Sequence, residues 1–345
     1  MRKMRKVKLY IGFVLMWVSV LPAMGQDINF SQFYELPMLR NPALAGIFAG
    51  DVRVTSAYRN QWENVTVPYR SFALGTEYKK SIGENSDDFI TFGFQATSDV
   101  AGDSRLSRTQ VFPVMNYNKS LGGERAGYIS AGIMGGVVMQ HFDPSRLTFD
   151  DQFVNGAYSA SNPTKQVFTQ TGFSYWDVSA GLSYSSVAGQ NIHYYLGLGL
   201  FHITEPKVAF QQQYDVKMNR KWMVNMGLSV PLNDQNSLIV YGDYFMQGGA
   251  RQGQGGALFN HDLSQFEDEK ITVAAGMFYR GKDAFIPVVK LNYYHLGLGI
   301  TYDVNSSKLK TASQYRGGFE LTLSYKAYRN NYNSSSNKVK CPSFY

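Results

Sequence analysis

The segment YRGGFELTLSYK, residues 315–326, alternates between two kinds of side chain. Every second residue from Tyr315 to Tyr325 is apolar or glycine, whereas every second residue from Arg316 to Lys326 is polar, charged or glycine. Successive side chains of a β-strand point to opposite faces, so a strand here has one apolar and one charged face. Ten residues at roughly 3.3 Å each, tilted by about 40°, span about 25 Å, the height of the apolar band of an outer-membrane barrel. Because aromatic residues end the apolar face on both sides, as in the girdles of such barrels, we predict that this segment crosses a bilayer.

The same alternation recurs between Asp51 and Ala327. It is clearest in residues 176–184, 192–200, 222–230 and 296–302. The chain contains 24 Tyr, 23 Phe and 33 Gly, yet its mean hydropathy is only -0.25. This combination is typical of strands whose apolar residues occupy alternate positions. We therefore predict an all-β fold, a transmembrane antiparallel up-and-down β-barrel of about 14 strands over residues 49–328.

Residues 1–25 have the composition of a secretory signal peptide. Basic residues precede an apolar run from Leu9 to Leu21, and small residues at Ala23 and Gly25 suit a signal peptidase. The run of about 13 residues is shorter than the ~20 that a membrane-spanning helix requires. Removing the five basic residues of the signal leaves 33 minus 5, or 28, basic residues against 26 acidic ones, a net charge of +2. The mature chain is therefore not basic enough to indicate a nucleic-acid partner.

The connections between the predicted strands indicate an orientation. Outer-membrane barrels have short periplasmic turns and longer outer loops. The longer connections are expected at residues 143–171, 204–221, 248–255 and 305–314. An even number of strands then leaves both termini in the periplasm.

Two stretches lie outside the predicted strands. Residues 26–48 contain Pro37 and Pro42, and we predict a periplasmic N-terminal segment that lies under the barrel or plugs its pore. Residues 329–345 form a polar tail, predicted to be periplasmic. The tail contains Cys341, the only cysteine, which is either an inert thiol or a reactive or intermolecularly paired group.

The charged side chains of the predicted lumen have two open interpretations. They form mutual salt bridges that fill the barrel, or they line a conduit. The residues concerned are Arg53, Glu77, Lys290, Arg316 and Glu320. The five histidines show no metal-ligand spacing, and no glycine-rich segment opens a helix as a phosphate loop does. We expect no catalytic residue, no metal site and no cofactor.

Several short blocks follow one another in the order of a known family. They are FSQF (30–33), NPA with AG (41–46), YRNQW (58–62), YR with DA (279–284), YDVN (302–305), GGFE (317–320) and CPSF (341–344). In these blocks the chain resembles the PorP/SprF family of type IX secretion system membrane proteins from Bacteroidetes. Residues 143–219 carry little that matches the family.

The resemblance implies a non-enzymatic outer-membrane barrel that supports export or surface attachment of proteins bearing a type IX C-terminal signal, such as gliding adhesins. The implied partners are the type IX machinery, the secreted client, outer-membrane lipid and a periplasmic peptidoglycan-binding lipoprotein. The alternative is a passive porin or small-solute transporter, and a third reading is an outer-membrane lipase or protease. Partner-binding candidates within the matched blocks are Asn41, Pro42, Arg59, Gln61, Trp62, Glu320, Cys341, Pro342 and Phe344.

Overall fold

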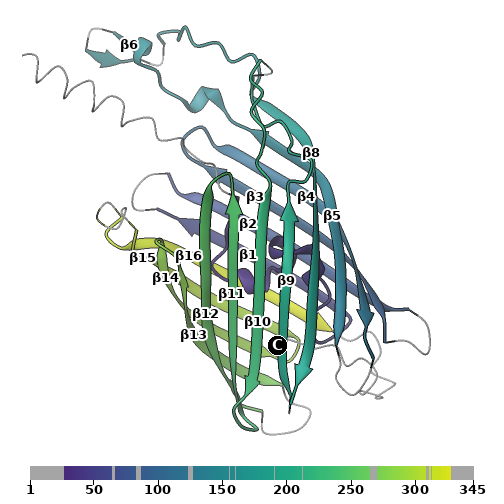
Figure 1. The fold of residues 1–345 in the computed structure, drawn as a ribbon. Helices are drawn as coiled ribbons and strands as arrows, with labels where there is room; N and C mark the ends of the chain where they lie inside the picture. The colour runs from purple at the N-terminus through teal and green to yellow at the C-terminus, as the bar shows by residue number, and fades with distance from the viewer. Residues whose placement is uncertain are drawn as a thin grey trace, which may run out of the picture.

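The computed structural model describes residues 27–63, 67–82, 87–122, 127–154, 156–159, 161–189, 191–211, 213–264, 270–307, 311 and 313–327. Within these residues, fourteen antiparallel strands close into one barrel, which confirms the predicted fold class (Figure 1). The barrel strands are β1 (Val52–Gln61), β2 (Tyr69–Ser81), β3 (Phe89–Ala101), β4 (Leu106–Ser120), β5 (Tyr128–His141), β8 (Gly172–Ala188), β9 (Ile192–Phe201), β10 (Lys221–Pro231), β11 (Asn236–Gln247), β12 (Ala250–Asp262), β13 (Ile271–Arg280), β14 (Ala284–Tyr293), β15 (Leu296–Asn305) and β16 (Arg316–Ala327).

The first and last strands close the barrel. β1 pairs with β16 from Val52 opposite Ala327 to Gln61 opposite Gly318. A closed sheet leaves no strand edge, so its backbone groups need no hydrogen-bond partner from lipid. Among the described residues, no helix is long and apolar enough to cross a membrane.

The alternation in the sequence separates an outer face from an inner face. In β16 the side chains of Phe319, Leu323 and Tyr325 are exposed on the outside, whereas Glu320 and Thr322 are buried inside. β10 and β15 repeat the pattern along their length. An outer surface of apolar and aromatic side chains suits the apolar layer of a bilayer.

Arg316 does not follow the predicted pattern, because it is exposed rather than directed into the lumen. The β15–β16 pairing shifts register here, with Asp303 opposite Gly318 and Val304 opposite Arg316. Gly317 is therefore the extra residue of a β-bulge, and the alternation reverses beyond it. A Cβ on Gly317 would lie 2.6 Å from the Asp303 carbonyl oxygen, so only glycine fits this close approach. The prediction for Arg316 is wrong because it assumed an unbroken strand.

The two ends of the barrel differ. We call the end at which β16 stops the turn end, and the opposite end the loop end. The two long connections, residues 142–171 and 202–220, lie at the loop end (Figure 1). The first of them contains η3 (Pro144–Arg146), η4 (Asp150–Gln152) and a small sheet of β6 (Phe153–Val154) and β7 (Ala157–Tyr158).

Residues 248–255 do not form the long loop that we expected. Gly248 and Gly249 have φ angles of 53° and 87°, and β12 begins directly after them at Ala250. Two positive φ values in succession are the requirement of a two-residue hairpin turn. The prediction is wrong because the glycines mark a tight turn rather than a loop.

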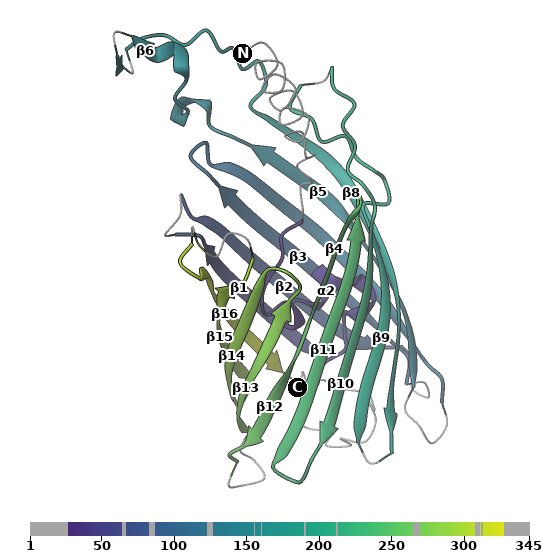
Figure 2. The ribbon, with the colours of Figure 1, turned by 60° about the vertical axis from the view of Figure 1, so that its left-hand side comes forward.

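Residues 27–50, which we call the plug, precede β1 and lie inside the barrel (Figure 2). They form η1 (Phe33–Glu35), α2 (Pro37–Arg40) and η2 (Pro42–Leu44). From residue 30 to residue 48 every side chain except that of Leu39 is buried. The division of the whole chain into signal peptide, plug, barrel and tail stays a prediction, because residues 1–26 and 328–345 lie outside the described residues.

Candidate functional site

The plug crosses the lumen from one end of the barrel to the other. Asp27 contacts Arg108 and Lys221 near the loop end. At the turn end, the backbone N–H of Asp51 donates to the carbonyl oxygen of Ala327, at 2.8 Å. The interface between the plug and the barrel wall therefore extends along the whole lumen, and it is the candidate functional site.

The prolines of the plug divide it into short turns. Pro37 and Pro42 each stand at the start of a helical turn, where the missing N–H costs nothing. The residue before a proline is biased towards extended backbone, and Asn41 has φ -169° and ψ 124°. Its side chain accepts a hydrogen bond from the backbone N–H of Ala43, at 2.9 Å. Asn41 thus ends α2 and caps η2.

Such an irregular backbone leaves buried N–H groups that need partners. Carboxylates of the wall accept from them. The N–H groups of Ser31 and Gln32 donate to the two oxygens of Glu320, at 2.6 and 2.7 Å. The N–H of Gly46 donates to Glu77, at 2.8 Å. Each carboxylate thus accepts from a turn of the plug, and Glu77 in addition pairs with Arg53 of the wall.

Donors of the wall bind carbonyl groups of the plug in the same way. The amide of Asn116 donates to the carbonyl oxygens of Ala43 and Ala45, at 3.0 and 2.7 Å. The amine of Lys79 donates to the carbonyl oxygen of Phe48, at 2.6 Å. The wall is therefore matched to the backbone of the plug as well as to its side chains.

Two ion pairs tie the middle of the plug to the wall. Arg40 binds Asp243 through two hydrogen bonds of 2.8 and 2.6 Å, and its third contact is the hydroxyl of Tyr195, at 2.8 Å. The Arg40 and Asp243 side chains are 4% and 0% exposed. Three strands away, Lys290 of β14 binds Glu35 of the plug. A two-pronged arginine–carboxylate pair also sets the orientation of the groups it joins.

A network of charges holds the plug near the loop end. Asp303 of β15 accepts from Arg59 at 2.6 Å, from Arg280, and from the Ser31 hydroxyl at 2.5 Å. Arg59 also donates to the carbonyl oxygen of Asn29. Three wall strands and the plug thus share one buried carboxylate.

Asp27 anchors the start of the described plug. Its carboxylate lies 2.9 Å from Arg108, 2.8 Å from His202 Nε2 and 3.3 Å from Lys221. The other ring nitrogen of His202 contacts Asp177, at 2.6 Å. Burial alone would lower the pKa of His202, but the two carboxylates outweigh burial and raise the pKa to about 9. Burial would raise the pKa of Asp27, but Lys221, His202 and Arg108 hold it well below its usual value.

Glycines in the wall allow the plug to come close at Asn41 and Pro42. A Cβ on Gly181 would lie 1.8 Å from the Asn41 side-chain oxygen. A Cβ on Gly132 would lie 2.5 Å from the carbonyl carbon of Pro42. The Asn41 amide also donates to the carbonyl oxygen of Leu182, at 3.2 Å. No side chain other than hydrogen fits at these two wall positions while the plug is seated.

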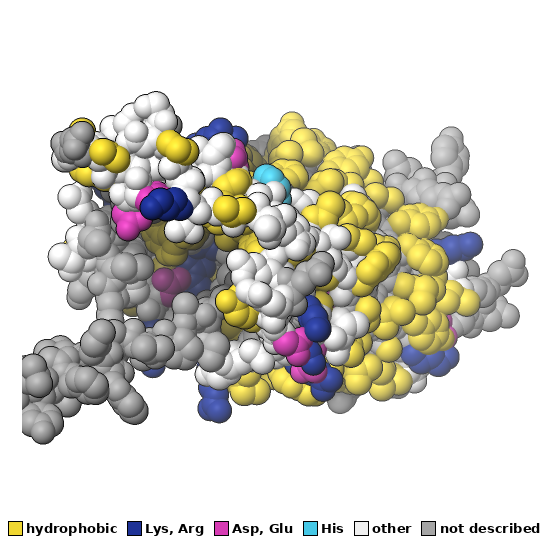
Figure 3. Space-filling view, turned by 90° about the horizontal axis from the view of Figure 1, so that it is seen from above, with side chains coloured by type: hydrophobic (Ala, Val, Ile, Leu, Met, Phe, Trp, Pro, Cys, Tyr) yellow, Lys and Arg dark blue, Asp and Glu magenta, His cyan; other side chains and the backbone are white. Residues whose placement is uncertain are grey.

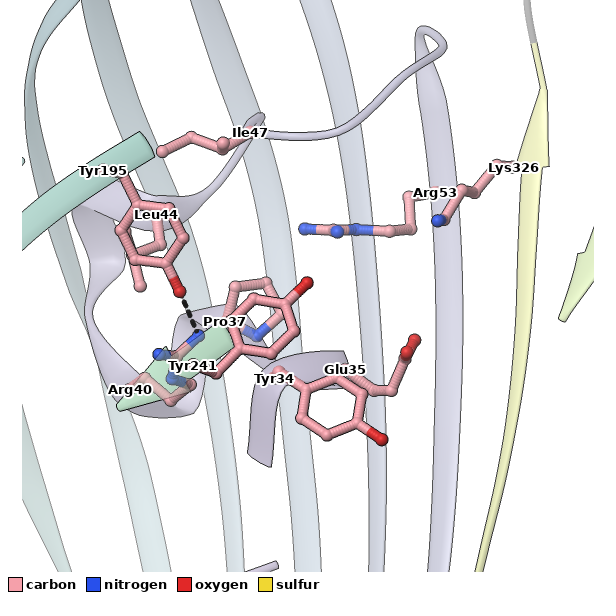
Figure 4. Close-up of a pocket in the computed structure, with 10 residues that line it drawn as sticks. All are labelled: Tyr34, Glu35, Pro37, Arg40, Leu44, Ile47, Arg53, Tyr195, Tyr241 and Lys326. Carbon is pink, nitrogen blue, oxygen red and sulfur yellow. Dashed lines mark hydrogen bonds between the residues drawn. The ribbon is translucent and has the colours of Figure 1, made fainter. Parts of the chain in front are cut away.

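Small cavities remain between the plug and the wall. In the described part of the chain, the cavity at the turn end has a volume of about 30 Å³, and Glu35 points in it towards Arg53 and Lys326 (Figure 4). Two further cavities around Asp27 are of the same size. About 30 Å³ is the share of one water molecule in the liquid. Seen from the loop end, the molecule is hollowed, with basic and acidic side chains inside the hollow (Figure 3).

A family model described as type IX secretion system membrane protein PorP/SprF matches residues 23–325 of the chain. The chain belongs to this family. It is accordingly an outer-membrane β-barrel of a secretion system. The match covers both the plug and the barrel, so the plug is part of the PorP/SprF domain. No curated protein matches the chain significantly.

Solved structures that resemble this PorP/SprF chain are only distantly similar. A Pseudomonas aeruginosa FadL homologue is 9% identical, with 83% of this chain and 92% of that chain covered and a TM-score of 0.47. Escherichia coli CdiB is 8% identical, with 79% and 63% covered and a TM-score of 0.42. Pseudomonas putida OprB is 9% identical, with 80% and 93% covered and a TM-score of 0.34. Likeness at this level carries no argument about what the present chain binds.

The structure places the predicted partner-binding residues in three regions. Asn41, Pro42, Arg59 and Glu320 lie at the plug–wall interface and make the intramolecular contacts described above. Gln61 and Trp62 lie at the loop end of β1, where the Trp62 ring packs on Tyr69 at 4.9 Å. Cys341, Pro342 and Phe344 lie outside the described residues. Partner binding by any of these residues stays a prediction.

The lumen charges pair both with one another and with the plug. Arg53 and Glu77 form the expected mutual pair at 2.6 Å, but Lys290 and Glu320 bind Glu35 and the plug backbone. Arg40, Asp243 and Asp303 are central to the interface, and sequence reasoning did not select them as site residues. For the two aspartates, the sequence signal that could have identified them was a charged residue on the otherwise uncharged inner face of a predicted strand. Among the described residues, no three His, Cys, Asp or Glu side chains gather as a metal site.

Proposed function

We propose that this chain is a non-enzymatic component of type IX protein secretion that supports export or surface attachment of proteins bearing a type IX C-terminal signal, gliding adhesins among them. Membership of the PorP/SprF family supports a role in secretion. The main support for the proposed mode of action is the plug inside the barrel, which has cavities of about 30 Å³ beside it. The plug is bonded to the wall from the loop end to the turn end, so we infer that the barrel acts by contact with its partners rather than as a passage for them.

We also infer which side of the membrane each end of the barrel faces. The loop end faces the outside of the cell and the turn end faces the periplasm, supported by the usual asymmetry of connection lengths. Since residues 30–48 are buried, periplasmic machinery or a peptidoglycan-binding lipoprotein would contact the turn-end connections and the tail, rather than the plug. Asp27, the first described residue, lies near the loop end, and the periplasmic position of both termini stays a prediction.

A passive porin or small-solute transporter is the alternative that the sequence left open. The charged lumen that motivated it is occupied by plug contacts such as Arg40 with Asp243 and Lys290 with Glu35. A solute could pass only if the plug left the lumen, and the buried ion pairs between the plug and the wall would then be broken. The alternative is therefore less favoured than a contact role.

The test is deletion of the gene, followed by measurement of surface levels of proteins with a type IX C-terminal signal. We expect at least one such protein to be lost from the surface and to be restored by the wild-type gene. Normal surface levels of all of them would contradict the proposal. A pull-down from the complemented strain, compared with a Cys341→Ser strain, then tests whether the tail binds a periplasmic partner.

A further inference from the structure

A cavity much larger than those beside the plug lies outside the lumen. It has a volume of about 520 Å³ and is formed at the loop end by the connections 142–171 and 202–220. Ligand pockets commonly measure about 300–1,000 Å³. This pocket is therefore of a size that takes a ligand, unlike the cavities beside the plug.

Aromatic rings build the floor of this pocket and join the two connections. Phe142 packs edge-to-face against Phe168 of the first connection, at 5.4 Å, and against Phe210 of the second, at 4.9 Å. Phe210 also packs against Phe173, at 4.8 Å. Interlocked rings of this kind fix one another's orientation, so the pocket is formed before anything binds.

The second connection is held in shape by its own hydrogen bonds. The N–H of Val208 donates to the carbonyl oxygen of Val216 at 2.8 Å, and the N–H of Met218 donates to Pro206 at 2.9 Å. At the rim, Tyr214 and Val216 are 57% and 53% exposed. Apolar side chains gathered on a loop that faces water are typical of a binding surface.

The chemistry of the lining indicates what the pocket binds. None of the lining residues is charged. Two of them are glutamines. The side-chain nitrogen of Gln170 donates to the carbonyl oxygen of Gly172 at 3.0 Å, and the side-chain oxygen of Gln211 accepts from Gln213 at 3.0 Å. Among the described residues, no hydrogen bond joins the Gln170 side-chain oxygen or the Gln211 side-chain nitrogen to another group. The pocket thus offers apolar walls together with uncharged hydrogen-bonding groups, the amides of Gln170 and Gln211 and the hydroxyls of Thr169 and Tyr214.

Uncharged donors and acceptors beside apolar walls match peptide bonds flanked by apolar side chains. A lipid acyl chain carries no group for either partner, and the absence of a lining cation gives an anionic headgroup no counter-charge. We propose that this pocket, defined by Phe142, Phe168, Phe210, Gln170 and Gln211, binds an uncharged polypeptide segment through its aromatic or aliphatic side chains. The identification of that segment with a secreted or surface-attached client rests on the proposed function, whereas the binding site itself does not.

The experiment uses the purified protein in lipid nanodiscs and a dye-labelled, end-capped hexapeptide of Gly, Phe and Leu as the probe, read by fluorescence anisotropy. Ala209 lines the pocket, so Ala209→Trp fills it and should weaken binding by about ten-fold or more. Gln211→Leu keeps the wall apolar, removes one of the hydrogen-bonding amides and should weaken binding by about five-fold or more. Thr148→Trp, an exposed position of the same connection outside the pocket, should leave binding unchanged.

The controls separate the possible ligands. A probe with Ser in place of Phe and Leu should bind at least about ten-fold more weakly, because it has no side chain for the apolar walls. Equal binding by wild type, Ala209→Trp and Gln211→Leu would overturn the inference. Displacement of the probe by dodecanol as readily as by unlabelled peptide would assign the pocket to lipid and overturn it too.

The same variants separate this inference from the proposed function. If gene deletion leaves type IX surface proteins at normal levels, the proposed function fails while a peptide-binding result stands. If deletion removes a surface protein but no pocket variant binds the probe less well, the pocket inference alone fails.

Discussion

Arg40 of the plug and Asp243 of β11 form a two-pronged ion pair inside the barrel, with side chains only 4% and 0% exposed. Tyr195 and Asn225 complete the hydrogen bonding of the pair, at 2.8 and 2.9 Å. A buried pair is costly to form, and far costlier to break on one side only. It therefore specifies where the plug sits more than it adds to overall stability.

Removal of one partner should destabilise the folded protein strongly. Arg40→Met leaves Asp243 as an uncompensated buried charge, which should lower the free energy of unfolding by about 3–5 kcal/mol. The double replacement Arg40→Met with Asp243→Leu should recover much of this loss. Reversible unfolding from detergent micelles measures both. Lys207→Met is the matched control, because its pair with Asp215 is 69% and 62% exposed and should not affect unfolding.

Loss of one acceptor oxygen from Glu320 should weaken the contact between the wall and the plug. Both of its oxygens accept backbone N–H groups of the plug, at 2.6 and 2.7 Å. Glutamine has one acceptor oxygen, so Glu320→Gln leaves one buried N–H unpaired at a cost of about 1–3 kcal/mol. Amide hydrogen exchange of Ser31 and Gln32 should speed up in this variant. Unchanged exchange at both amides would contradict the role of Glu320.

A single methyl group on the wall should displace the plug. In Gly181→Ala the new Cβ would lie 1.8 Å from the Asn41 side-chain oxygen, so the Asn41 cap must move. Overpacking of this kind costs about 1–3 kcal/mol and should lower the melting temperature. In the control, Gly253→Ala, the nearest atom is Tyr244 Cδ2 at 3.5 Å, an ordinary contact. If Gly253→Ala were as unstable as Gly181→Ala, overlap with Asn41 would not explain the loss of stability.

The loop-end anchor of the plug should weaken in alkaline solution. The pKa of His202 rises from 6.5 to about 9, so its contribution is fully present below pH 6.5 and is lost as the pH rises through about 9. A shift of this size corresponds to about 3 kcal/mol. The pKa of Asp27 lies well below 3.8, so on the acid side its contribution is lost only far below that pH. Hydrogen exchange of residues 28–30, corrected for intrinsic rates, should accelerate as the pH rises from about 6.5 to about 9 and level off above that, and His202→Gln should abolish this pH dependence.

The sequence supported the barrel well because strand alternation is local. Each of the clearest segments, such as residues 222–230, became a strand with the predicted outer face. The errors arose where one residue changes the pattern. The bulge at Gly317 moved Arg316 outwards, and the turn at Gly248 and Gly249 replaced an expected loop.

The plug interface could not be predicted to the same extent. Ser31 and Glu320 are 289 residues apart in the chain, and no local pattern pairs them. Alternation shows that Glu320 faces the lumen, but not whether a salt bridge, a conduit or a backbone turn meets it there. Wall glycines such as Gly181 resemble ordinary strand glycines until the plug is in place. Contacts between distant residues require the three-dimensional structure.

The central claim is that the plug closes the barrel, and single-channel conductance in planar lipid bilayers tests it most directly. The intact purified protein at neutral pH should show no steady conductance. A variant with a loosened plug, Arg40→Met with Glu320→Gln, should show intermittent openings. Stable ohmic channels from the intact protein would contradict the claim and favour a transport function.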